Sequence, residues 1–168
     1  MRALWVLLLV AAAGCDTAVA PAPSAGLLQT DASRYDVTLG VSPARVEVDI
    51  PYTLRSPDGA ATVYTGCFPP RPPELQKLVG GEWVRAYDQV HPLCLSPPFV
   101  LPAGEARADT LRVWAALPGQ SAAPTFELDE IAGTYRLVQA IYAGADDDGI
   151  GRDPLPLEAR VSNSFELR

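Results

Sequence analysis

The sequence has few of the side chains on which acid–base, metal and nucleic-acid chemistry depend. It contains one His and three Cys in 168 residues, and its 13 Lys and Arg are outnumbered by 20 Asp and Glu. Phosphate binding needs clustered Lys and Arg, so a net charge of −7 argues against a nucleic-acid partner. With one imidazole and no nucleophile motif, we expect no enzyme activity and no resident cofactor. Apolar residues still make up 48% of the chain, enough for the core of one domain.

The N-terminus has the pattern of an export signal. Arg2 supplies positive charge, and residues 3–13 are apolar without interruption. This run fits the core of a signal peptide. It is too short for a membrane-spanning helix, which needs about 20 residues. The residues that follow, Gly14 and Cys15, complete a junction that resembles a bacterial lipobox, in which small residues precede a lipidated Cys.

This resemblance implies a lipoprotein signal peptide at residues 1–14 and an acylated Cys15 that holds the protein on a membrane of the bacterial cell envelope, facing the periplasm or exterior. The alternative is an ordinary secretory signal that is cut nearby and leaves Cys15 unmodified. Residues 15–33 are rich in Ala, Pro and Ser and show no sustained period, so we expect a flexible tether there. Residues 34–168 would form a single domain.

The domain is predicted to consist of strands. Residues 45–55 alternate between apolar and polar side chains, as in a half-buried antiparallel strand, and Pro51 indicates an edge or a bulge because it lacks an N–H. A last strand is predicted over residues 157–167, where Asn163 on the apolar face suggests a bulge or bend. Further strands are predicted at residues 62–66, 75–79, 82–87, 110–116 and 134–142. About seven to nine short strands, with no convincing helical period, indicate an all-β antiparallel sandwich.

Short motifs point to a more specific architecture. They lie at residues 133–137 (GTYRL), 162–167 (SNSFEL), 75–78 (LQKL) and 81–84 (GEWV). Together they resemble bacterial immunoglobulin-like domains and, more distantly, the intracellular proteinase inhibitors of bacilli. The resemblance implies an immunoglobulin-like β-sandwich from about Tyr35 onward. Antibody-type domains carry a Cys two residues after the corner Tyr, where this chain has Leu137, although Tyr135 could still form a tyrosine corner.

Cys67 and Cys94 are the two thiols that remain if Cys15 is lipidated. An exported compartment is oxidising, so we expect a disulfide between them, which would stabilise the fold by roughly 3 to 4 kcal/mol. The alternatives are a redox pair, which lacks the usual Cys-x-x-Cys spacing, and a metal site, for which His91 is the one available imidazole. A Cys94–His91 nucleophile would lack a recognisable orienting partner, so we expect a loop His.

Residues 144–153 form an acidic cluster. Asp146 and Asp148 match two ligand positions of an EF-hand loop, but the first and last ligand positions fall on Gly144 and Leu155, which carry no carboxylate. A solvated hairpin loop explains this composition. A weak Ca²⁺ site made by Asp146, Asp148 and Asp153 is the alternative, and no other metal site is predicted.

Two further pairs have structural explanations. Asp129 and Glu130 are adjacent, would point to opposite faces of a strand, and are expected to begin a turn rather than act as catalytic carboxylates. Trp83 and Trp114 are expected to pack in the core or between sheets.

The sequence therefore predicts a lipid-anchored, exported, monomeric immunoglobulin-like module with a binding or structural role. Its partner, a protein or another envelope component, is not identified by the sequence, and residues 67–94 and 144–154 are the loops expected to bind it. The alternatives are a proteinase inhibitor that presents the disulfide-closed loop and a Ca²⁺-dependent adhesion module. A hydrolase is not expected, because no nucleophile elbow or His-rich motif is present.

Overall fold

The computed structural model describes residues 26–41, 44–64, 71–89, 98–120, 122–145 and 151–168. One short helix is found among them, α1 (Leu157–Arg160). The strands are β1 (Leu28–Thr30), β2 (Arg34–Tyr35), β3 (Thr38–Val41), β4 (Ala44–Arg55), β5 (Thr62–Tyr64), β6 (Glu74–Val79), β7 (Glu82–Arg85), β8 (Tyr87–Asp88), β9 (Phe99–Leu101), β10 (Ala106–Ala116), β11 (Thr125–Phe126), β12 (Gly133–Val138), β13 (Tyr142–Ala145), β14 (Gly151–Pro154) and β15 (Phe165–Leu167).

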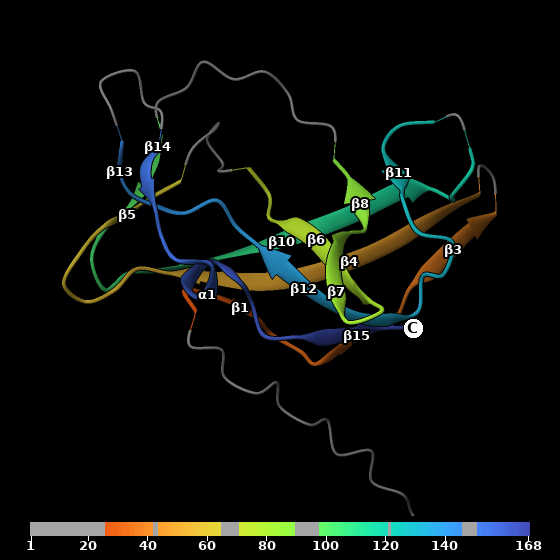
Figure 1. The fold of residues 1–168 in the computed structure, drawn as a ribbon, viewed down its shortest axis with the longest axis horizontal. Helices are drawn as coiled ribbons and strands as arrows, with labels where there is room; N and C mark the ends of the chain where they lie inside the picture. The colour runs from red at the N-terminus through yellow and green to blue at the C-terminus, as the bar shows by residue number, and fades with distance from the viewer. Residues whose placement is uncertain (1–25, 42–43, 65–70, 90–97, 121, 146–150) are drawn as a thin grey trace, which may run out of the picture.

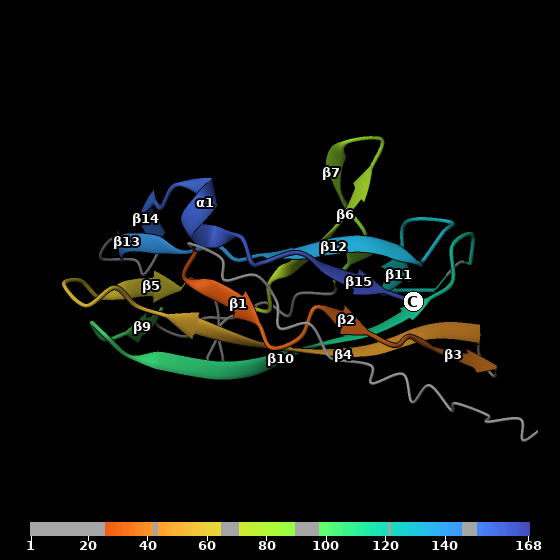
Figure 2. The same ribbon diagram turned by 90° about the horizontal axis from the view of Figure 1, so that it is seen from below.

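The strands form three sheets, of which two make the layers of a sandwich (Figures 1 and 2). The first sheet has the order β1-β4-β10-β11-β8, with β3 also paired to β4, and the second has the order β2-β15-β12-β6-β7. A smaller sheet, β14-β13-β5-β9, lies at one end. The predicted all-β sandwich is therefore confirmed. Its strands are more numerous than expected, because many consist of only two to four residues, and two of the strand pairs are parallel.

The longest ladder joins β4 to β10. Its register runs without a break from Ala106 opposite Arg55 to Ala116 opposite Arg45. The period-2 pattern of β4 is confirmed, because every second side chain from Val46 to Leu54 is buried in the core. On β10 the same alternation buries Leu111, Val113 and Ala115.

Pro51 lies in a gap between two strands that share one side of β4. β10 covers the whole of the other side, whereas β1 pairs with residues 52–54 and β3 with residues 44–47. The carbonyl of Pro51 faces this gap and accepts a hydrogen bond from the backbone N–H of Asp31 at 3.3 Å. β4 is thus neither an edge strand nor bulged, and the missing N–H of Pro51 falls where no ladder bond is needed.

The N-terminal boundary of the domain lies earlier than the sequence suggests. Leu28 is fully buried, and β1 pairs with β4. Residues 28–33, which the sequence pattern places in the tether, are therefore part of the sandwich, because Leu28 belongs to its core and Thr30 is buried.

Tyr135 forms a tyrosine corner. Its hydroxyl donates a hydrogen bond to the backbone carbonyl of Ile131, four residues upstream, at the start of β12. The buried ring stacks on Phe165 with centroids 6.3 Å apart, and Phe126 from the opposite sheet lies 6.4 Å away. This aromatic cluster joins the two layers of the sandwich.

The first part of the C-terminal segment differs from the prediction. Residues 157–160 form the single helical turn α1 instead of a strand, and Leu157 is exposed. Pro156 precedes this turn and accepts a hydrogen bond from the N–H of Ala159 at 3.0 Å. Pro is compatible with the start of a helix, and Leu, Glu, Ala and Arg are good helix formers. Four alternating residues are too few to distinguish the two structures.

Asn163 has a structural role that explains its place on an apolar face. Its Oδ1 accepts a hydrogen bond from the backbone N–H of Thr30 at 2.8 Å, and its Nδ2 donates to Thr30 Oγ1 at 2.7 Å. Both residues are buried. Strand pairing is interrupted at residues 162–164, and the Asn163 amide joins this segment to β1 instead.

The two described tryptophans lie on outer surfaces. Trp114 is 50% exposed on the outer face of β10, with the Arg45 guanidinium 5.0 Å from its ring centre, so the expectation of core packing is wrong for this residue. Trp83 on β7 is partly buried and stacks against Arg136 at 4.4 Å.

We expect Asn163→Ala to lower the free energy of unfolding by about 1 to 3 kcal/mol, because it leaves the buried Thr30 N–H without an acceptor. Urea unfolding measures the change. Ser164→Ala, at an exposed neighbouring position, is the matched control and should change stability little. Equal effects of the two substitutions would contradict this role of Asn163.

We also expect stability to decrease above pH 10. Burial raises the pKa of five tyrosines, Tyr35, Tyr52, Tyr64, Tyr87 and Tyr135. The unfolded chain loses these protons near pH 10 while the folded protein keeps them, so stability is fully present below that pH and falls above it. Thermal unfolding midpoints between pH 8 and 11 measure the effect, with tyrosinate absorbance as a second signal. Tyrosines that titrate at their ordinary pKa in the folded protein would contradict it.

Candidate functional site

Most of the residues singled out in the sequence lie outside the described part of the chain. They are Cys15, Cys67, Cys94, His91, Asp146 and Asp148. Asp153 is described: it is exposed, has a φ of 56°, and belongs to β14, which pairs with β13 in a hairpin. Asp129 and Glu130 lie in the segment between β11 and β12, as expected. The described residues contain no group of three potential metal ligands from His, Cys, Asp and Glu.

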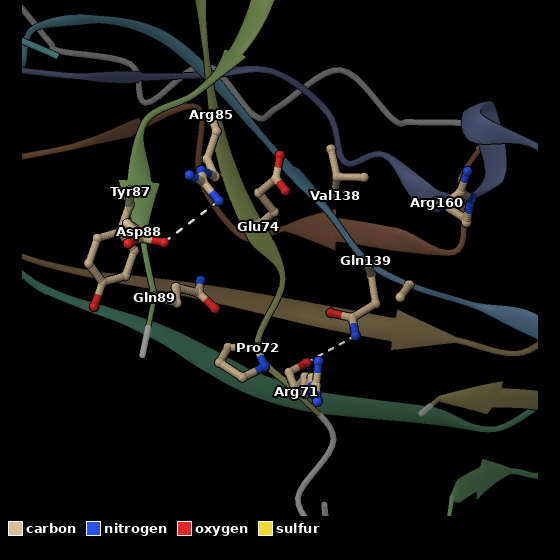
Figure 3. A pocket seen from close by; sticks show the side chains of 11 residues that line it. Arg71, Pro72, Glu74, Arg85, Tyr87, Asp88, Gln89, Val138, Gln139 and Arg160 are labelled. Atoms are coloured by element: carbon tan, nitrogen blue, oxygen red, sulfur yellow. Dashed lines mark hydrogen bonds and ion pairs between the residues drawn. The ribbon is translucent and has the colours of Figure 1, made fainter. Parts of the chain in front are cut away.

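A polar groove of about 320 Å³ opens where the two main sheets meet (Figure 3). We call it the corner groove. Its walls come from the chain that leads into β6, the ends of β7, β8 and β12, and the end of α1. The described residues that line it are Arg71, Pro72, Glu74, Arg85, Tyr87, Asp88, Gln89, Val138, Gln139, Ala140 and Arg160.

The chain passes from one sheet to the other beside this groove. β7 pairs with β6 in the second sheet, whereas β8, one residue later, pairs with β11 in the first. The residue between them, Ala86, is fully buried and bonds to both sheets. Its N–H donates to Leu75 O, and its carbonyl accepts from Glu127 N, each at 2.9 Å. The groove therefore lies where the chain crosses from one sheet to the other, and the hydrogen bonds of Ala86 fix this crossing in place.

Two consecutive prolines end the ladder at this corner. The β6–β12 pairing stops at Glu74 opposite Val138, and Pro72 and Pro73 have no N–H to continue it. Beyond the end of the ladder, side-chain amides donate hydrogen bonds to the backbone carbonyls. Gln139 Nε2 donates to Arg71 O at 3.0 Å, and Gln89 Nε2 donates to Pro73 O at 2.7 Å.

These hydrogen bonds fix the orientation of both amides. Because each nitrogen faces a backbone carbonyl, each oxygen must point the other way, and Figure 3 shows the oxygens of Gln89 and Gln139 directed toward the space between them. Both Oε1 atoms are buried and have no hydrogen-bond partner. Gln139 is only 2% exposed. An unsatisfied buried acceptor costs about 1 to 3 kcal/mol, so a hydrogen bond donated to either oxygen would stabilise the protein.

Charges are distributed unevenly around the groove. On the β7–β8 side, Arg85 binds Glu127 through two nitrogens, at 2.8 and 3.3 Å, and lies 3.6 Å from Asp88. The hydrogen bonds to Glu127 raise the pKa of Arg85 further above its ordinary value. With Glu74 nearby, three carboxylates surround one guanidinium.

The opposite side of the groove is positive. Arg71 is exposed, and its backbone carbonyl, rather than its guanidinium, makes the hydrogen bond to Gln139. Arg160 donates from Nε to Leu155 O at 2.7 Å, and Figure 3 places it on the far side from Asp88. The corner groove thus has a negative side, a positive side and two hydrogen-bond acceptors between them.

The groove offers groups that bind by hydrogen bonds and ion pairs. The sequence did not indicate it, because Gln89 and Gln139 are far apart in the chain and neither belongs to a motif; the pair of prolines at residues 72–73 was the one local signal.

Comparisons with protein-family models, curated proteins and solved structures returned no match. Within the described residues, no helix is both long and apolar enough to cross a membrane.

Proposed function

We propose that this protein is an exported, lipid-anchored immunoglobulin-like module of the bacterial cell envelope, and that it binds a partner rather than catalyses a reaction. The observation that carries the binding role is the buried, unpartnered Oε1 of Gln139 in the corner groove. A polar atom of this kind is stabilised when a ligand donates a hydrogen bond to it.

The anchor rests on the N-terminal sequence. The apolar run at residues 3–13 and the Gly14-Cys15 junction support cleavage before Cys15 and acylation of its sulfur. β1 begins at Leu28, so a short tether would separate the lipid from the sandwich. More than one acyl chain gives stable membrane attachment. Export would also place Cys67 and Cys94 in an oxidising compartment, which favours a disulfide between them.

The proteinase-inhibitor and Ca²⁺-dependent alternatives depend on the segment from Cys67 to Cys94 and on Asp146 and Asp148. Cys67, Cys94, Asp146 and Asp148 lie outside the described part of the chain, and no described contact favours either alternative. Binding in a groove of the folded sandwich needs neither of them.

The intact mass of the protein from the membrane fraction of its host tests the proposal. We expect a chain that begins at Cys15 and carries acyl chains. Two thiols should become alkylated only after reduction, because the disulfide would protect Cys67 and Cys94.

The Cys15→Ala variant is the control. It should lose the acyl mass and leave the membrane fraction, because a net negative protein has no charge attraction to anionic lipid. An unprocessed wild-type chain with three free thiols in the soluble fraction would overturn the anchored, exported module.

A further inference from the structure

We propose that the corner groove binds a short zwitterionic peptide by its two charged ends, with the ammonium between Gln89 and Gln139 and the carboxylate at Arg71 and Arg160. This inference rests on the proposed binding function and names its ligand class. It is argued from the acceptors, the charges and the size of the groove.

The two amide oxygens require a ligand that donates hydrogen bonds. Both nitrogens are already committed to the carbonyls of Arg71 and Pro73, so the amides cannot turn over and present donors. An ammonium group carries three N–H donors, enough for both Oε1 atoms and one further acceptor. Asp88, which lines the groove next to Gln89, supplies that acceptor. Hydrogen bonds from a charged donor are also stronger than those from a neutral one.

The charges select a ligand with both signs. Around the β7–β8 side, the charge of Arg85 is offset by Glu127 and Asp88, with Glu74 adding a further negative charge. Arg71 and Arg160 form the positive side. An anionic ligand would meet the carboxylates, and a cationic ligand would meet the arginines. A zwitterion that lies across the groove pairs with both sides at once.

The size and the remaining surface favour a short peptide with small side chains. A volume of about 320 Å³ is at the lower end of the range for small-molecule sites. The apolar part of the described lining consists of Pro72, Val138 and Ala140. A neutral sugar would leave the separated charges unpaired. Tyr87 is also only 7% exposed, so its ring offers little surface for sugar stacking.

Isothermal titration of the full chain, solubilised in detergent, tests this inference with tri-alanine as the probe. We expect tri-alanine to bind. N-acetyl-tri-alanine, which lacks the ammonium, and tri-alanine amide, which lacks the carboxylate, should each bind about tenfold more weakly or worse, because each loses charge-assisted hydrogen bonds. Alanine as a free amino acid should bind more weakly than tri-alanine, since its two charges are too close together to reach both sides.

Arg71→Ala is the informative variant. Its fold should be preserved, because the hydrogen bond from Gln139 is accepted by the backbone carbonyl of Arg71, and its affinity for tri-alanine should fall about tenfold. Arg55→Ala removes an exposed arginine at the end of β4, outside the groove lining, and is the matched control, with no expected change. Thermal unfolding midpoints verify that both variants are folded.

Three results would overturn the inference: no heat with millimolar tri-alanine, equal binding of the blocked peptides, or equal loss in both arginine variants. Binding of N-acetylglucosamine without binding of tri-alanine would assign the groove to a sugar instead. These outcomes are distinct from a failure of the proposed function, because membrane attachment and acylation are read from the mass and not from the titration.

Discussion

The ladder between β4 and β10 is the interaction on which the rest of the structure depends. Eleven consecutive residue pairs join the two strands, and their inward side chains supply a large part of the core. β1 and β3 attach to one side of this pair, and β11 and β8 extend the other. Burial of alternating apolar side chains along both strands also fixes the register, because a shift by one residue would turn every one of them to solvent.

The corner groove follows from the way the second sheet meets this ladder. The chain must pass from the second sheet, where β6 and β7 pair, to the first sheet, where β8 pairs with β11, and it does so at Ala86. Pro72 and Pro73 stop the ladder at the same corner, which leaves backbone carbonyls that need donors. The amides of Gln89 and Gln139 satisfy these carbonyls and in doing so leave their own oxygens without partners. A requirement of the fold thus produces the groups to which we assign ligand binding.

The sequence predicts the parts of the fold that depend on local periodicity. β4 is recognised because eleven residues alternate and one face is buried. α1 was missed because one turn is too short to show a helical period. Trp114 was misplaced because its size suggested the core, although the neighbouring Val113 and Ala115 already occupy the inward positions. The groove could not be predicted, since it depends on contacts between segments that are distant in the chain.

Native-state hydrogen exchange tests the central role of the β4–β10 ladder most directly. If the ladder holds the sandwich together, its hydrogen-bonded amides should exchange only through global unfolding, with a free energy equal to that from urea unfolding. The amides of β13 and β14, in the small sheet at one end, should exchange faster through local opening. Exchange of the β4–β10 amides at the same rate as those of β13 and β14, or faster, would contradict the account.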